Sequence, residues 1–208
     1  MKFIKWYALE IYTFIALTVL LIAGLMEGIV PQQKFIMIYM LLFVFHEWEE
    51  GRYPGGFLTI IADKILCREV PEEIKRGSRL PAGILLLVIT LIPFFLNRYT
   101  MLVLVPVFLG LFEGLVHIVF IKLGELDKPY SPGMVTAELE LVTSIAAIVY
   151  FGKCGIAAGR DYVCGFLLTI VCFMALQKAL FAMIGVPYSE LPKMMRARIK
   201  SLRNKASG

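Results

Sequence analysis

The stretch that decides the fold is residues 101–123, with the sequence MLVLVPVFLGLFEGLVHIVFIKL. Its only ionisable side chains are Glu113, His117 and Lys122. A helix that crosses a bilayer needs about 20 predominantly apolar residues, and this run supplies them. The sequence therefore predicts a transmembrane helix here.

Five further apolar runs accompany it. The first is too long for the core of a signal peptide, so we expect a retained span. The second, third and fifth runs are shorter than the bilayer requires, so we expect them to be tilted or partly recessed. The six runs cover residues 7–28, 35–50, 80–96, 101–123, 133–152 and 162–185.

The composition agrees with lipid as the solvent. Hydrophobic residues make up 59% of the 208-residue chain and charged residues 18%, whereas a soluble domain carries about 25% charged residues. The fold class predicted is all-α: a polytopic helical bundle with about six transmembrane helices. The net charge of +5 does not indicate nucleic-acid binding, because the basic residues lie between apolar runs and in the tail.

The basic residues predict the topology. Sixteen of the 21 Lys and Arg residues fall on the side of the N-terminus, four fall on the opposite side, and Lys178 lies within the sixth run. Since cytosolic loops are enriched in Lys and Arg, we expect a multi-pass protein of the cell membrane with both termini in the cytosol.

Two segments outside the spans are expected to contact the membrane surface. Residues 57–66, between spans two and three, are apolar but too short to span, so they predict a cytosolic interfacial helix. Residues 1–190 form one predicted transmembrane domain, and residues 191–208 form a basic cytosolic tail. The tail is interpreted either as a helix on anionic head groups or as a topology signal alone. Cys154 and Cys164 flank the last outer turn, where a disulfide is one alternative.

Several ionisable residues lie within the apolar runs. Each costs at least about 2.5 kcal/mol near mid-bilayer, so such residues usually face the bundle interior and have a function. At 100° per residue, His46, Glu49 and Glu50 share one face of the second run. Glu113 and His117, four residues apart, share a face of the fourth run with small glycines, which favours a close helix contact there.

The fifth run begins with Glu138 and Glu140, which point 200° apart. We favour Glu140 as the inward-facing residue, because Thr136, Thr143 and Ser144 lie on its side. Glu138 remains the alternative if the helix is rotated. The helix rise places His46, His117 and Glu140 about 7–10 Å below the cytosolic surface, in one layer.

A metal site explains this convergence most economically. Imidazole suits zinc and iron, and carboxylates suit harder ions. The ligand set fits either a carboxylate-bridged dinuclear centre or a single zinc with three protein ligands and water. The predicted ligands are His46, Glu49, Glu50, Glu113, His117 and Glu138. The predicted catalytic groups are Glu49, Glu140 and Tyr130. No nucleotide cofactor is expected.

Three short motifs occur in an order that resembles a known family. His46-Glu47-Trp48-Glu49-Glu50 fits His-x-x-Glu-Glu, a second histidine follows at His117, and residues 130–133 fit Tyr-x-Pro-Gly. This combination resembles the HXXEE domain family of integral membrane proteins. The resemblance marks these positions as the family's signature and implies no particular activity. A His-Glu-x-x-Glu variant of the zincin motif, with Glu47 as base, is a minority interpretation, because the family pattern leaves position 47 free.

Three functions are compatible with this pattern. The first is a membrane-embedded metalloenzyme that acts on a lipid or another small apolar molecule by hydrolysis or oxidation. The second is a transporter of an ion or proton, since buried His and Glu also mark ion pathways. The third is a metal-free isomerase or ligand-binding membrane protein, in which the same residues handle protons or bind the ligand.

Overall fold

The computed structural model describes residues 2–206, and these residues form helices and no strand. The all-α prediction is therefore confirmed. In chain order the elements are α1 (Lys2–Trp6), α2 (Ala8–Gly24), α3 (Pro31–Gly51), α4 (Phe57–Ile61), the π-helical η1 (Ala62–Leu66), α5 (Glu72–Gly77), α6 (Arg79–Phe95), α7 (Thr100–Leu123), α8 (Met134–Lys153), α9 (Gly159–Ile184), the 3₁₀ turn η2 (Tyr188–Glu190) and α10 (Leu191–Ala206).

Four helices in the described part of the chain are long and apolar enough to cross a membrane. They are Glu72–Phe95, which joins α5 to α6, and α7, α8 and α9. Helix α2 is apolar but shorter, and α3 carries polar residues at both ends. The length and composition of these four helices indicate a membrane protein.

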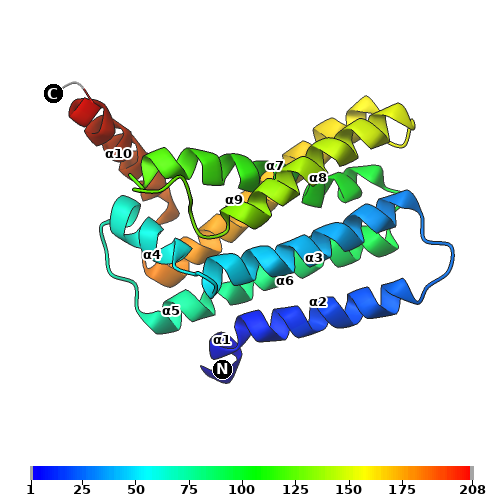
Figure 1. Ribbon diagram of the computed structural model, residues 1–208, viewed down its shortest axis with the longest axis horizontal. Coiled ribbons are helices and arrows are strands. Elements are labelled where there is room, and N and C mark those ends of the chain that lie inside the picture. The colour runs from blue at the N-terminus through cyan, green and yellow to red at the C-terminus, as the bar shows by residue number, and fades with distance from the viewer. Residues whose placement is uncertain (1, 207–208) are drawn as a thin grey trace.

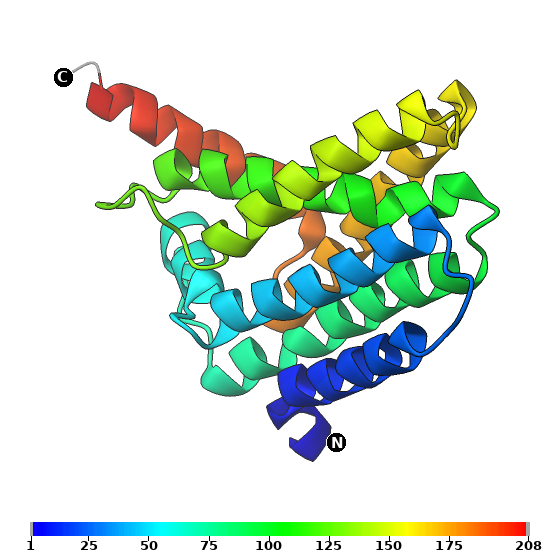
Figure 2. The ribbon, with the colours of Figure 1, turned by 45° about the vertical axis from the view of Figure 1, so that its right-hand side comes forward.

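The long helices lie side by side and alternate in direction (Figure 1). The N-terminus, α4, α5 and α10 gather at the left-hand end of that view, and the loops after α2, α6 and α8 lie at the right. Figure 2 shows α8 crossing α7, with α3 and α6 beneath them. The same end of the bundle therefore holds both described chain ends and the C-terminal end of α3.

Small residues allow the helices to approach closely around α7. A Cβ atom built on Gly114 would lie 2.6 Å from Cβ of Leu141 in α8, and one built on Gly110 would lie 2.9 Å from Oγ of Ser144. Van der Waals contact between carbon atoms lies at about 3.5–4.0 Å. The glycine face of α7 therefore packs against α8, as its sequence predicts, and it carries Glu113 and His117 into the same interface.

Apolar side chains cover much of the outer surface. Only three residues of helix α9 are buried, and its outward residues include Phe166, Val171 and Met174. Apolar surface of this extent is unfavourable in water and favourable in hydrocarbon.

The segments outside the long helices are also helical. Residues 57–66 form α4 and η1, and the basic tail forms α10. Arg198 of α10 donates to the carbonyl of Leu123 and to Glu125, which fixes the tail against the C-terminal end of α7. Cys154 and Cys164 are free thiols, so the disulfide alternative is not realised in this structure.

Candidate metal centre

His46 lies in the last turns of α3, and its ring is held from one side. Nδ1 lies 3.1 Å from the carbonyl oxygen of Gly133 and 3.1 Å from Oγ1 of Thr136. Because a carbonyl oxygen only accepts, Nδ1 carries the proton in the first contact. In the neutral ring, the lone pair of Nε2 is then free to bind a metal ion. Outer hydrogen bonds of this kind fix the tautomer and orientation of metal-binding histidines.

His117 presents the same arrangement from α7. Its Nδ1 lies 2.8 Å from Oγ of Ser131, and the side chain is completely buried. Nε2 has no hydrogen-bond partner in the described structure. An unpaired buried polar atom is costly, so a ligand for this nitrogen would be favourable. The ring stacks on Phe57, with centroids 4.7 Å apart, which holds its plane.

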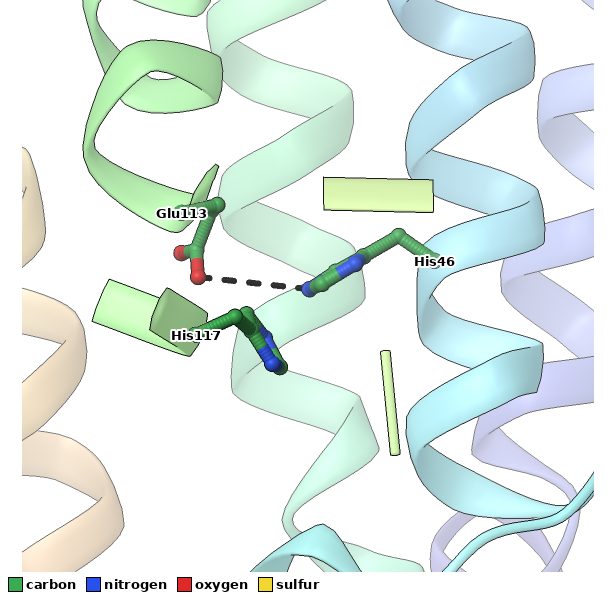
Figure 3. A group of neighbouring side chains, drawn as sticks. All are labelled: His46, Glu113 and His117. Atoms are coloured by element: carbon green, nitrogen blue, oxygen red, sulfur yellow. Dashed lines mark ion pairs between the residues drawn. The ribbon is translucent and has the colours of Figure 1, made fainter. Parts of the chain in front are cut away.

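Glu113 completes a compact group with the two histidines (Figure 3). One ligand atom from each residue lies within 4.8 Å of the other two, and Glu113 Oε2 is 3.9 Å from His46 Nε2. All three residues are buried or half-buried. The metal-site prediction is thus confirmed in its coarse form, since this group could hold a metal ion.

Glu50 adds a fourth candidate ligand atom, an oxygen, beside the two rings. Its Oε1 lies 3.7 Å from His46 Nε2 and 3.4 Å from His117 Nε2. For a tetrahedral zinc with bonds of about 2.0–2.1 Å, neighbouring ligand atoms are separated by roughly 3.4 Å. Only small movements would therefore bring these atoms into coordinating positions.

Arg79 holds Glu50 in this orientation and was not predicted as a site residue. Its Nη1 donates to Glu50 Oε2 at 2.8 Å and to Glu47 Oε2 at 3.0 Å. All three side chains are buried. Glu47 is thus neutralised by Arg79, which disfavours the zincin-like role for it. The sequence did contain a signal for an inward-facing Arg79. This residue shares a helix face with the small residues Ala82 and Gly83, which favour close helix contacts.

Gly133 packs directly against Glu50 and both imidazole rings. Its φ of +94° is readily adopted only by glycine. A Cβ atom there would lie 2.6 Å from Cγ of Glu50, 2.8 Å from Cε1 of His117 and 3.1 Å from Cε1 of His46. The Tyr-x-Pro-Gly turn therefore contributes a residue without a side chain at the point where both rings meet.

Glu49 occupies a different place from the predicted one. Its Oε2 accepts from the Thr136 amide and hydroxyl at 2.9 and 2.6 Å, and its Oε1 accepts from the Val135 amide and from Tyr130. The carboxylate therefore caps the first turn of α8 and is not among the grouped ligand atoms. Burial, together with the bond to Glu49, raises the pKa of Tyr130 to about 12, so this hydroxyl stays a donor at neutral pH.

The two acids of α8 differ in environment. Glu140 is completely buried, and neither of its oxygens has a hydrogen-bond partner in the described structure. Glu138 is half-buried and lies outside the group of ligand atoms. Glu140, which the sequence favours as the inward-facing acid, is thus the more deeply buried of the two. It lies about one helical turn beyond Thr136, the residue to which Glu49 binds.

A cavity of about 620 Å³ adjoins the metal group. Its polar lining includes His46, Glu50 and Glu113, together with Arg79. The remaining lining is largely apolar and comes chiefly from α7 and α9. Cavities of about 300–1,000 Å³ with a few convergent polar groups are typical of small-molecule sites.

Comparisons with known proteins leave the site to be interpreted from its geometry. Neither family models, nor curated proteins, nor solved structures gave a match to this chain.

Proposed function

We propose that this protein is a membrane-embedded metal-dependent enzyme that acts on a lipid or another small apolar molecule. One observation carries the proposal: two imidazoles, each held through Nδ1, direct Nε2 toward Glu113 and Glu50 at the polar end of an apolar cavity. Three or four N and O ligands suit zinc or iron.

The site supports one ion better than two. Among the acids near the rings, Glu47 is paired with Arg79 and Glu49 is engaged at α8. Only Glu50 and Glu113 then remain beside the rings as carboxylate ligands. A single ion would act as a Lewis acid and lower the pKa of bound water. Glu50, tethered through Oε2, would be either the fourth ligand or the base beside that water. Zinc would favour hydrolysis, and iron would favour oxidation.

The membrane arrangement belongs to the same proposal. The six long helices would cross the cell membrane, with α4 and η1 at the cytosolic interface and both termini in the cytosol. The shared location of the chain ends supports this topology (Figure 1). Membership of the HXXEE domain family is also proposed, and the signature residues supporting it converge in space: His46, Glu50 and His117 line the group, Gly133 packs against all three, and Tyr130 binds Glu49.

A second candidate is a metal-free site that handles protons. The buried Glu140, with both oxygens unpaired, favours it, because ionisable groups of this kind mark proton relays. An ion transporter is less well supported. Beyond Glu140 large side chains such as Tyr39, Phe94 and Phe151 fill the bundle.

Elemental mass spectrometry of the purified protein tests the proposal. We expect about one zinc or iron per chain, lost in His46→Ala and His117→Ala variants that remain folded. Glu113→Gln and Glu138→Gln form a matched pair: the first should lower the metal content and the second should not. Wild-type protein that binds no metal, even after incubation with Zn²⁺ or Fe²⁺, would overturn the proposal in favour of the metal-free site.

A further inference from the structure

The cavity beside the metal group is a slot between the C-terminal halves of α7 and α9. On α7 its lining extends from Leu109 to Leu123, and on α9 from Ile170 to Ile184. Each span covers fourteen steps along a helix, or about 21 Å at 1.5 Å per residue. The two helices run in the same direction, so these lengths face one another.

Helices α7 and α9 approach closely in their N-terminal halves, and the slot lies farther along. A Cβ atom on Gly165 of α9 would lie 2.8 Å from Cβ of Leu104, so the backbones approach there. Farther along, the rings of Phe112 and Phe173 pack between the two helices, with centroids 6.5 Å apart. Residues of α4, η1 and α10 also line the slot.

The dimensions of the slot suit one chain. A volume of about 620 Å³ over roughly 21 Å gives a mean cross-section of roughly 30 Å². This area accommodates a single alkyl chain with carbon contacts of about 3.5–4.0 Å to the walls.

One wall of the slot opens sideways. Leu115 and Val119 line it and are 48% and 55% exposed. Both belong to α7, which is long and apolar enough to span a membrane. A molecule dissolved in the bilayer would therefore reach the slot laterally between α7 and α9, without passing through water.

The charge at the polar end restricts the head group. The slot exposes the carboxylates of Glu47, Glu50 and Glu113, against one guanidinium, Arg79, that already donates to two of them. In the metal-free site a phosphate would meet net negative charge, which a bound divalent ion would offset. A small neutral oxygen group would avoid this repulsion and could approach the metal group.

We propose that the slot binds a single-chain lipid with a small neutral oxygen head, such as a long-chain alcohol or aldehyde, which it takes from the bilayer. The head lies beside His46 and Glu113, and the chain lies between α7 and α9. Naming this lipid as the substrate rests on the proposed function, whereas its binding to the slot does not.

Photolabelling tests the proposal. Wild-type protein in phosphatidylcholine vesicles would be irradiated with a hexadecanol that carries a diazirine in its chain, and the labelled residues would be mapped by mass spectrometry. We expect labels concentrated on slot residues of α7 and α9, and reduced at least fivefold by excess unlabelled hexadecanol. Labels on other lipid-facing residues should not be reduced.

Two variants place a bulky ring in the slot at positions outside the metal group: Val119→Trp and, as a second case, Val116→Trp. The matched control is Val142→Trp, because Val142 lies on α8 and is 64% exposed. The competed labelling should fall at least fivefold in the slot variants and persist in the control. Labels distributed evenly over all lipid-facing helices, or unchanged by both slot variants, would overturn the proposal.

The metal content of the same samples separates the two claims. Slot labelling in a protein without metal would support the lipid site and refute the metalloenzyme. A full complement of metal without competed labelling would refute the lipid site alone.

Discussion

Adding one methyl group at Gly133 is predicted to weaken both the metal group and the fold. The Gly133→Ala variant places Cβ 2.8 and 3.1 Å from Cε1 of His117 and His46, and 2.6 Å from Cγ of Glu50. Carbon contacts settle at about 3.5–4.0 Å, so the rings or the turn must move by roughly 0.5–1 Å.

The expected magnitudes follow from two separate costs. Placing alanine at positive φ costs about 1–2 kcal/mol, and overpacking a filled site costs about 1–3 kcal/mol. Gly133→Ala should therefore lower the free energy of unfolding by about 2–5 kcal/mol. Displaced ligands should weaken metal binding by about 10–100-fold, as losing an outer partner of a metal-binding histidine does.

Gly185→Ala is the matched control. Gly185 also has positive φ, at +74°, but no atom lies within 4 Å of its added Cβ, so only the backbone cost of about 1–2 kcal/mol applies. Unfolding in mixed micelles would measure stability, and competition with a chelator would measure metal affinity. Equal destabilisation of both variants, with metal affinity unchanged in Gly133→Ala, would refute the placement of Gly133 between the two rings.

Three further perturbations separate the roles of the surrounding residues. Glu49→Ala removes the acceptor at the start of α8 and should cost about 1–2 kcal/mol of unfolding free energy with the metal content retained; loss of metal without loss of stability would contradict the capping role. Arg79→Met leaves two buried carboxylates unpaired and should cost about 3–5 kcal/mol in the same unfolding assay, whereas a neutral effect would refute the pairing. Hydrogen bonds from Lys205 and Arg198 lower the pKa of Glu125, so tail docking should be complete above the ordinary glutamate pKa and lost as the pH falls through the lower folded value; hydrogen exchange in α10 that does not rise on acidification would contradict this.

The helices and the faces of the site were predictable because their causes are local. The spacing of Glu113 and His117, with glycines on the same face, is a property of one helix, and the structure confirms that this face packs inward. The two histidines lie close together as predicted, with ring centroids 5.2 Å apart. Periodicity and apolar length sufficed for these conclusions.

The partners of each carboxylate were not predictable in the same way. Glu49 and Glu50 are neighbours on one helix, yet Glu49 caps α8 and Glu50 faces the rings. The rotation of α3 against α8 decides which carboxylate caps α8 and which faces the rings. Arg79, on a helix distant in sequence, also contributes by binding Glu50. From sequence alone, a basic residue such as Arg79 at the end of an apolar run is most simply interpreted as a topology signal. Only the packing of α6 against α3 shows that it pairs with Glu47 and Glu50.

X-ray absorption spectroscopy of the metal-loaded protein tests the central claim most directly. If His46 and His117 both bind the ion, the spectrum will contain scattering from two imidazole rings and first-shell N and O atoms, at about 2.0–2.1 Å for zinc. The imidazole scattering should halve in either His→Ala variant that retains metal. A first shell without imidazole in the wild type, or imidazole scattering unchanged in both variants, would contradict a metal centre shared between α3 and α7.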